Sequence, residues 1–192
     1  MAEKRGKMNL PTHYIIAKLA AENAGLTLVK RTAFCIGAML PDLSPNQFIH
    51  RHFYRKSGEY IMKKLQRLSG KSSVFSLLAM GKAAHYVSDF CCSVHFGGSI
   101  GNARQHLLYE QQLHRYAAEK YPTLKAECSS FTGSHSVQDA LSEYFDDEKF
   151  DFHTDLIYAV KACYAICRLA KSSKNIFVYG ISEDLAIDSP HI

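Results

Sequence analysis

Side chains of the kinds that bind metal ions are concentrated in one short stretch of the chain. Residues 85–110 read HYVSDFCCSVHFGGSIGNARQHLLYE, and five of these 26 residues are histidines or acidic residues: His85, Asp89, His95, His106 and Glu110. The first pair has the spacing HxxxD and the last pair the spacing HxxxE. On a helix, residues four apart differ in direction by only about 40° and lie one turn apart, so the members of each pair face the same way.

The residue types in this stretch point to zinc. Imidazole nitrogens and carboxylate oxygens are the ligands that zinc accepts when cysteine is absent. His95 lies between the two pairs, close to the glycines Gly97, Gly98 and Gly101. The stretch therefore predicts a helix, a ligand-bearing loop and a second helix, with one metal-binding arm on each helix.

A histidine and a carboxylate four residues apart have a simpler explanation, which is a hydrogen bond or weak ion pair on a helix surface. Two such pairs with a histidine between them favour a metal site over this explanation. The neighbours of His85 in LLAMGKAAHYV are largely apolar, which predicts that this side chain is buried. A buried histidine and a buried aspartate need partners, and a metal ion would satisfy both.

Helical periodicity dominates the rest of the chain. Thr12 is a candidate N-cap after Pro11, Pro41 is expected to end the second helix, and Asp42 is expected in the turn LPDLSPNQ. The segment 123–136 is rich in Ser, Thr and Gly and predicts a loop, and the tail 175–192 fits a strand-like strap or a short helix. The expected helices cover residues 13–25, 28–39, 58–68, 71–92, 102–121, 137–145 and 151–173.

These elements predict an all-α protein, a single compact multi-helix bundle over residues 1–192 with metal ligands projecting into an interior cleft. The chain has 192 residues, 47% of them hydrophobic and 21% charged, which suits one good core. The net charge of +5 is mild and is compatible with anionic membranes or phosphate substrates, and no basic run suggests nucleic-acid binding.

The six cysteines form no CxxC motif, so we expect free thiols in a reducing compartment. A site rearranged to use Cys91 or Cys92 remains an alternative, because thiolates bind zinc well.

The N-terminal residues contain no apolar run of signal-peptide length, and no window approaches the ~18 apolar residues of a membrane span. These features lead us to expect a cytoplasmic protein without a transmembrane segment.

Five motifs in order along the chain resemble those of one enzyme family. They are THYIIAKLA at 12–20, GAMLPDL at 37–43, HFY at 52–54, HYVSDFCCSVH at 85–95 and HLLYE at 106–110. In this order they resemble the bacterial zinc-dependent phospholipases C, a family related to certain nucleases. Each motif alone is weak, but the five together make a specific match that covers a little over half of the chain.

The resemblance implies an all-α fold with three metals at the bottom of a cleft. By motif, His52, His85 and Asp89 would hold the first zinc. His50 is the less favoured candidate for the position given to His52. A second zinc would be held by His95, His106 and Glu110. A third would be shared by Asp89 and His13, and Asp42 would be the general base.

The sequence departs from the family pattern in three places. It has no tryptophan, whereas characterised members use an N-terminal tryptophan at the third metal. Ser93 stands where a proline is usual, and Leu43 and Ile49 replace aromatic residues of the choline pocket. The metal-binding core is therefore better supported than a specificity for phosphatidylcholine.

The function implied is a metal-dependent phosphodiester hydrolase with two or three Zn²⁺ ions, cleaving a phospholipid to diacylglycerol and a phosphorylated headgroup. The expected partners are a phospholipid or another phosphodiester as substrate and peripheral contact with a membrane. Two alternatives remain. One is a phosphatase or nuclease acting on soluble phosphate esters, and the other is a non-catalytic, metal-stabilised helical binding protein.

Overall fold

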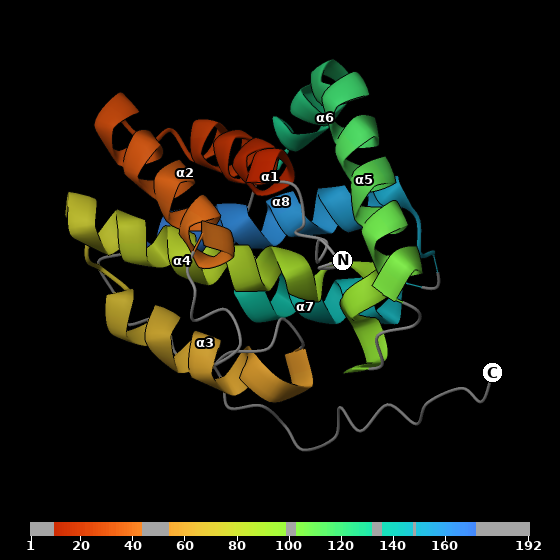
Figure 1. Cartoon of the computed structure of the whole chain (residues 1–192). Helices are drawn as coiled ribbons and strands as arrows, with labels where there is room; N and C mark the ends of the chain where they lie inside the picture. The colour runs from red at the N-terminus through yellow and green to blue at the C-terminus, as the bar shows by residue number, and fades with distance from the viewer. Residues whose placement is uncertain (1–9, 44–53, 99–102, 132–135, 148, 172–192) are drawn as a thin grey trace.

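All regular structure in the described residues is helical, which confirms the predicted all-α class (Figure 1). The computed structural model describes residues 10–43, 54–98, 103–131, 136–147 and 149–171. The helices are α1 Leu10–Asn23, α2 Leu28–Leu43, α3 Tyr54–Leu68, α4 Val74–Phe90, the 3₁₀ helix η1 Ser93–Gly98, α5 Ala103–Glu119, α6 Tyr121–Cys128, α7 Val137–Asp146 and α8 Phe152–Leu169. None of these helices is long and apolar enough to span a membrane.

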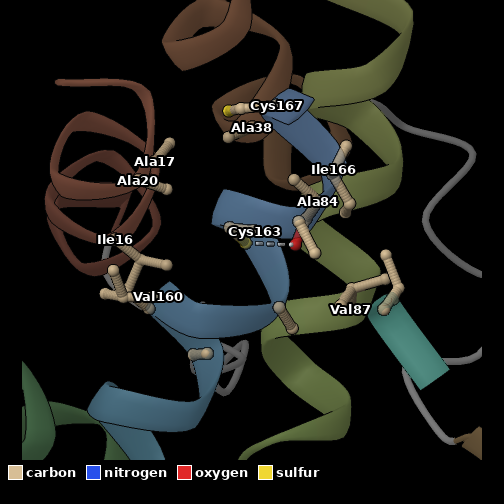
Figure 2. Packing of buried hydrophobic residues seen from close by; sticks show 14 of the residues in the cluster. Ile16, Ala17, Ala20, Ala38, Ala84, Val87, Val160, Cys163, Ile166 and Cys167 are labelled. Atoms are coloured by element: carbon tan, nitrogen blue, oxygen red, sulfur yellow. Dashed lines mark hydrogen bonds between the residues drawn. The ribbon is translucent and has the colours of Figure 1, made fainter. Parts of the chain in front are cut away.

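Helix α8 is the core helix, as its apolar sequence predicted, and α1, α4 and α7 pack against it. Asp151 caps its start by accepting a hydrogen bond from the Thr154 backbone N–H. Small side chains let the neighbouring helices approach closely, and Figure 2 shows α8 between α1 and α4. The Cys163 thiol donates a hydrogen bond to the Ala84 carbonyl of α4. All six cysteines are free and buried, so the prediction of free thiols is confirmed.

Helices α2 and α4 run side by side in the same direction and touch at two glycines. A Cβ added to Gly37 would lie 2.2 Å from the Leu78 carbonyl oxygen, and one added to Gly81 would lie 2.1 Å from the Phe34 carbonyl oxygen. Only glycine permits this approach of two backbones. One turn further along, the contact brings the Ala38 carbonyl to the His85 ring. The glycine contact therefore sets where the ends of α2 and α4 meet.

Several predicted helix boundaries are wrong. Helix α1 begins at Leu10, so Thr12 lies inside its first turn and is not the N-cap; proline is tolerated there because the first N–H groups have no helical acceptor. Helix α2 continues through Pro41 to Leu43, which places Asp42 in a helix and not in a turn. Helix α3 begins four residues earlier than expected, at Tyr54, whose ring packs on Phe90 and Phe145.

The segment expected to be a loop, 123–136, is partly helical, because α6 extends from Tyr121 to Cys128. Pro122 ends one helix but also sits in the first turn of the next, where its fixed φ is favourable. The ligand-bearing loop is the 3₁₀ helix η1. Ser73 caps the start of α4, since its side-chain oxygen accepts a hydrogen bond from the Ser76 backbone N–H. The tail 175–192 lies outside the described residues.

We predict that Gly37→Ala destabilises the protein by roughly 3 kcal/mol, the upper end for overpacking, because the new methyl group meets rigid backbone. Thermal or urea unfolding monitored by circular dichroism measures the change. The matched control is Gly58→Ala, where the atoms nearest to the added Cβ belong to the Tyr54 ring and not to backbone, and where alanine improves helix propensity, so we expect a smaller loss. Equal losses in the two variants would contradict the role of the glycine contact.

Candidate metal centre

The first group of side chains that could hold a metal ion comes from α1, α2 and α4. One nitrogen or carboxylate oxygen from each of His13, Asp42 and His85 lies within 4.8 Å of the others. Asp42 Oδ1 is 3.6 Å from His85 Nε2, and Asp42 Oδ2 is 3.9 Å from His13 Nε2. Asp89, one turn after His85, places its two oxygens 3.4 Å from the Nε2 atoms of His13 and His85. Four side chains thus converge on one point.

The second group comes from η1 and α5 and consists of His95, His106 and Glu110. His106 Nε2 lies 2.7 Å from Glu110 Oε1, and His95 Nε2 lies 3.7 Å from the same oxygen. His95 Nε2 is also 4.0 Å from Asp89 Oδ1. Asp89 therefore stands between the two groups, and they form one cluster.

Hydrogen bonds on the far side of the imidazoles determine which nitrogens face the cluster. His85 Nδ1 lies 2.9 Å from the Ala38 carbonyl oxygen, which can only accept, so Nδ1 carries the proton. The single hydroxyl proton of Ser88 goes to the His85 carbonyl at 2.7 Å, so His13 Nδ1, 2.9 Å from Ser88 Oγ, must be the donor there. When neutral, both rings therefore present an Nε2 lone pair to the carboxylates.

This arrangement fits a cation. Lone pairs of two imidazoles face carboxylate oxygens at 3.4–3.9 Å, and atoms rich in electrons repel unless positive charge lies between them. Histidines that bind metal usually donate their other N–H to a carbonyl or a similar acceptor, as His13 and His85 do here. The nitrogen and oxygen donors suit zinc.

Burial strengthens the argument for a cation. Asp42, Asp89 and Glu110 are 6%, 0% and 3% exposed, and burying ionised carboxylates is costly unless they are paired. Burial alone would raise the pKa of the Glu110 carboxyl, but hydrogen bonds from His106 and His95 outweigh it and hold this pKa below its usual value. Glu110 Oε2 is buried and has no hydrogen-bond partner among the described residues, so it retains a free acceptor for a cation.

The structure brings together all the predicted site residues that it describes. His13, His85, Asp89, His95, His106 and Glu110 lie in the cluster, as does Asp42, the predicted general base. His52, the seventh predicted ligand, and His50 lie outside the described residues, so their roles stay predictions. The assignment of each residue to a particular ion also stays a prediction.

Sequence reasoning missed the supports of the two histidines, Ser88 and the Ala38 carbonyl. Ser88 comes three residues after His85, a spacing at which a serine hydroxyl often returns to the helix backbone. Its contact with His13 spans 75 residues and leaves no local signal.

The metal-binding groups among the described residues contain no cysteine, and burial raises the pKa of the Cys91 and Cys92 thiols well above the usual value. The described geometry therefore favours the histidine and carboxylate ligands over the alternative that uses a cysteine.

Comparison with protein families agrees with this geometry. The family model for zinc-dependent phospholipase C matches residues 12–165, more than half of the chain. The chain therefore belongs to the zinc-dependent phospholipase C family, whose name indicates zinc as the metal and hydrolysis of the phospholipase C type in general. Neither the curated proteins nor the solved structures contain a match.

We predict that Ser88→Ala lowers zinc affinity about 10–100-fold, because it removes the acceptor that orients His13. Competition with a chromogenic chelator measures the affinity. Ser142→Ala, in α7 and away from the cluster, is the matched control, since its hydroxyl makes only a long contact of 3.5 Å with Asp146. An unchanged affinity in Ser88→Ala would show that this hydrogen bond does not support the site.

Proposed function

We propose that this protein is a zinc-dependent phosphodiester hydrolase that cleaves a phospholipid to diacylglycerol and a phosphorylated headgroup. The observation that carries the proposal is the convergence of two groups of metal-binding side chains that share Asp89. Two neighbouring sites suit phosphoryl chemistry, because charge develops on several oxygens at once. Membership in the phospholipase C family supports the lipid substrate.

Among the described residues, His85 and Asp89 would hold the first ion, and His95, His106 and Glu110 would hold the second. A third ion, as the motifs imply, would be shared by Asp89 and His13. When bound, zinc lowers the pKa of a coordinated water and neutralises charge on the phosphoryl oxygens.

Asp42 is the proposed general base. Its carboxylate lies in the last turn of α2, beside both His13 and His85, and only 8% of its side chain is exposed. There it can accept a proton from the attacking water. The water oxygen bonds to phosphorus, the bond from phosphorus to the glycerol oxygen breaks, and that oxygen takes up a proton to give diacylglycerol.

Exposed apolar side chains beside the cluster favour a lipid substrate over a soluble one. Tyr14 is 41% exposed and follows His13, and Leu43 is 56% exposed and follows Asp42. Leu108 is 46% exposed but lies two residues from both His106 and Glu110, and so on the opposite side of α5. Two of the segments that form the cluster therefore carry an exposed apolar residue directly after a cluster residue, which supports peripheral contact with a lipid surface.

We predict that Asp42→Asn lowers turnover about 10²–10⁴-fold while zinc content stays at the wild-type level, because the amide keeps the shape but cannot take a proton. Elemental analysis gives the zinc content, and the rate at which the phosphorylated headgroup is released from the phospholipid gives the turnover. Asp146→Asn, an exposed position in α7, is the control. Loss of zinc in Asp42→Asn would make Asp42 a ligand and not a base.

We also predict that Tyr14→Ser combined with Leu43→Ser lowers hydrolysis of phospholipid in vesicles at least about tenfold, because two apolar contacts with the lipid are lost. Hydrolysis of a soluble phosphodiester such as p-nitrophenyl phosphorylcholine should stay unchanged. Both rates are measured by product release under the same zinc concentration.

Phe75→Ser provides the matched control for this test. Phe75 is 84% exposed but lies at the start of α4, ten residues and so about 15 Å along the helix before His85. The Phe75→Ser variant should keep wild-type activity on vesicles. A wild-type protein that hydrolyses soluble phosphate esters and leaves vesicles intact would instead favour the phosphatase or nuclease function.

A further inference from the structure

Asp155 is a buried carboxylate that belongs to neither metal-binding group. It projects from the first turn of α8 and is 1% exposed. Its Oδ2 accepts hydrogen bonds from the Ser93 backbone N–H at 2.9 Å and from the Tyr109 hydroxyl at 2.7 Å. Its Oδ1 accepts from the Tyr144 hydroxyl at 2.8 Å. One carboxylate thus joins four elements, η1, α5, α7 and α8.

Two of these donors stand next to metal-binding residues. Ser93 begins η1, two residues before His95, and Tyr109 directly precedes Glu110 on α5. Both donors bind the same oxygen, Asp155 Oδ2. The distance between η1 and α5 at this point is therefore limited to what one oxygen can bridge. The third donor, Tyr144, belongs to α7, which carries no residue of either metal-binding group.

We propose that Asp155 is a positioning residue for the second metal-binding group, holding η1 and α5 in the register that lets His95 meet Glu110. The proposal rests on the proposed zinc-dependent function. Asp155 does not face the ions in this role. It acts through the Ser93 backbone and the Tyr109 ring, which also packs on Phe152 with ring centroids 4.8 Å apart.

The chemistry of the three donors explains why a carboxylate stands here. An N–H and two hydroxyl groups point at one buried position, and an ionised carboxylate offers acceptor sites to all three. Asparagine would replace one oxygen with an NH₂ group that cannot accept, and an apolar residue would leave the buried donors without partners. The cost of burying one charge is thereby offset by hydrogen bonds that fix two segments distant in sequence.

A second reading treats Asp155 as a general stabiliser of the fold with no link to zinc. Two tyrosines separate the two readings, because Tyr109→Phe and Tyr144→Phe each remove one hydroxyl donor from the same carboxylate. Only Tyr109 lies on an element that carries metal-binding residues. The pair is therefore matched in chemistry and differs in its connection to the site.

The experiment measures zinc binding to the full chain by chelator competition, for the wild type, Tyr109→Phe, Tyr144→Phe and Asp155→Asn. Melting temperatures are recorded alongside. Glu110→Ala assigns which of the measured affinities belongs to the second group. We expect Tyr109→Phe to weaken zinc at the second group about tenfold. Tyr144→Phe should lower the melting temperature about as much as Tyr109→Phe does. Its zinc affinity should stay within about threefold of the wild type.

Asp155→Asn should weaken the second group further, and in the Glu110→Ala background it should leave the affinity of the first group unchanged. Equal effects of the two tyrosine variants, or a loss at both groups in Asp155→Asn, would overturn the positioning role. If Asp155→Asn does not fold, the two tyrosine variants still distinguish a positioning role from general stabilisation of the fold. A wild-type chain that binds no zinc would overturn the proposed function itself, a result distinct from the failure of Asp155 alone.

Discussion

Three carboxylates buried against four histidines form the interaction on which this region of the molecule depends. Asp89 and His85 are fully buried, and Asp42 and Glu110 nearly so. Removing an ionised carboxylate from water costs several kcal/mol even after relaxation, and apposed imidazole lone pairs add repulsion. A divalent cation offsets the first term and turns the second into an attraction, because each carboxylate and lone pair then faces positive charge. The free energy of metal binding is then also free energy of folding for α1, α2 and α4 at this end.

The cluster exists only because helices distant in sequence pack in one register. His13, Asp42 and His85 are each separated by about 30 or more residues, so no local preference can bring them together. The contact between Gly37 and Gly81 does so for α2 and α4, since it lets the two backbones touch about one turn before the cluster. Substituting either glycine by a larger residue would therefore move a carboxylate away from an imidazole as well as disturb the packing.

The existence of the helices and most of the candidate site could be predicted from sequence, because both depend on local spacing. HxxxD and HxxxE place two side chains on one helix face wherever the helix lies, and the order of the motifs supplied the rest. Boundaries failed where proline was read only as a helix terminator. Pro11 and Pro122 lie in the first turns of helices, where a missing N–H costs little, and Pro41 lies in the last turn of α2, which continues two residues beyond it. The contacts of Ser88 and Asp155 span 75 and 62 residues and follow from packing alone.

The two halves of the cluster are held by different means. The first group lies on helices whose backbones touch, and its imidazoles are fixed by a carbonyl and a serine. The second group lies on η1 and α5, which are joined through the Asp155 carboxylate. It is also the more open half, since the His106 side chain is 18% exposed against 1% for His13. The more exposed half of the cluster is therefore held by side-chain hydrogen bonds, and the more buried half is held by backbone packing.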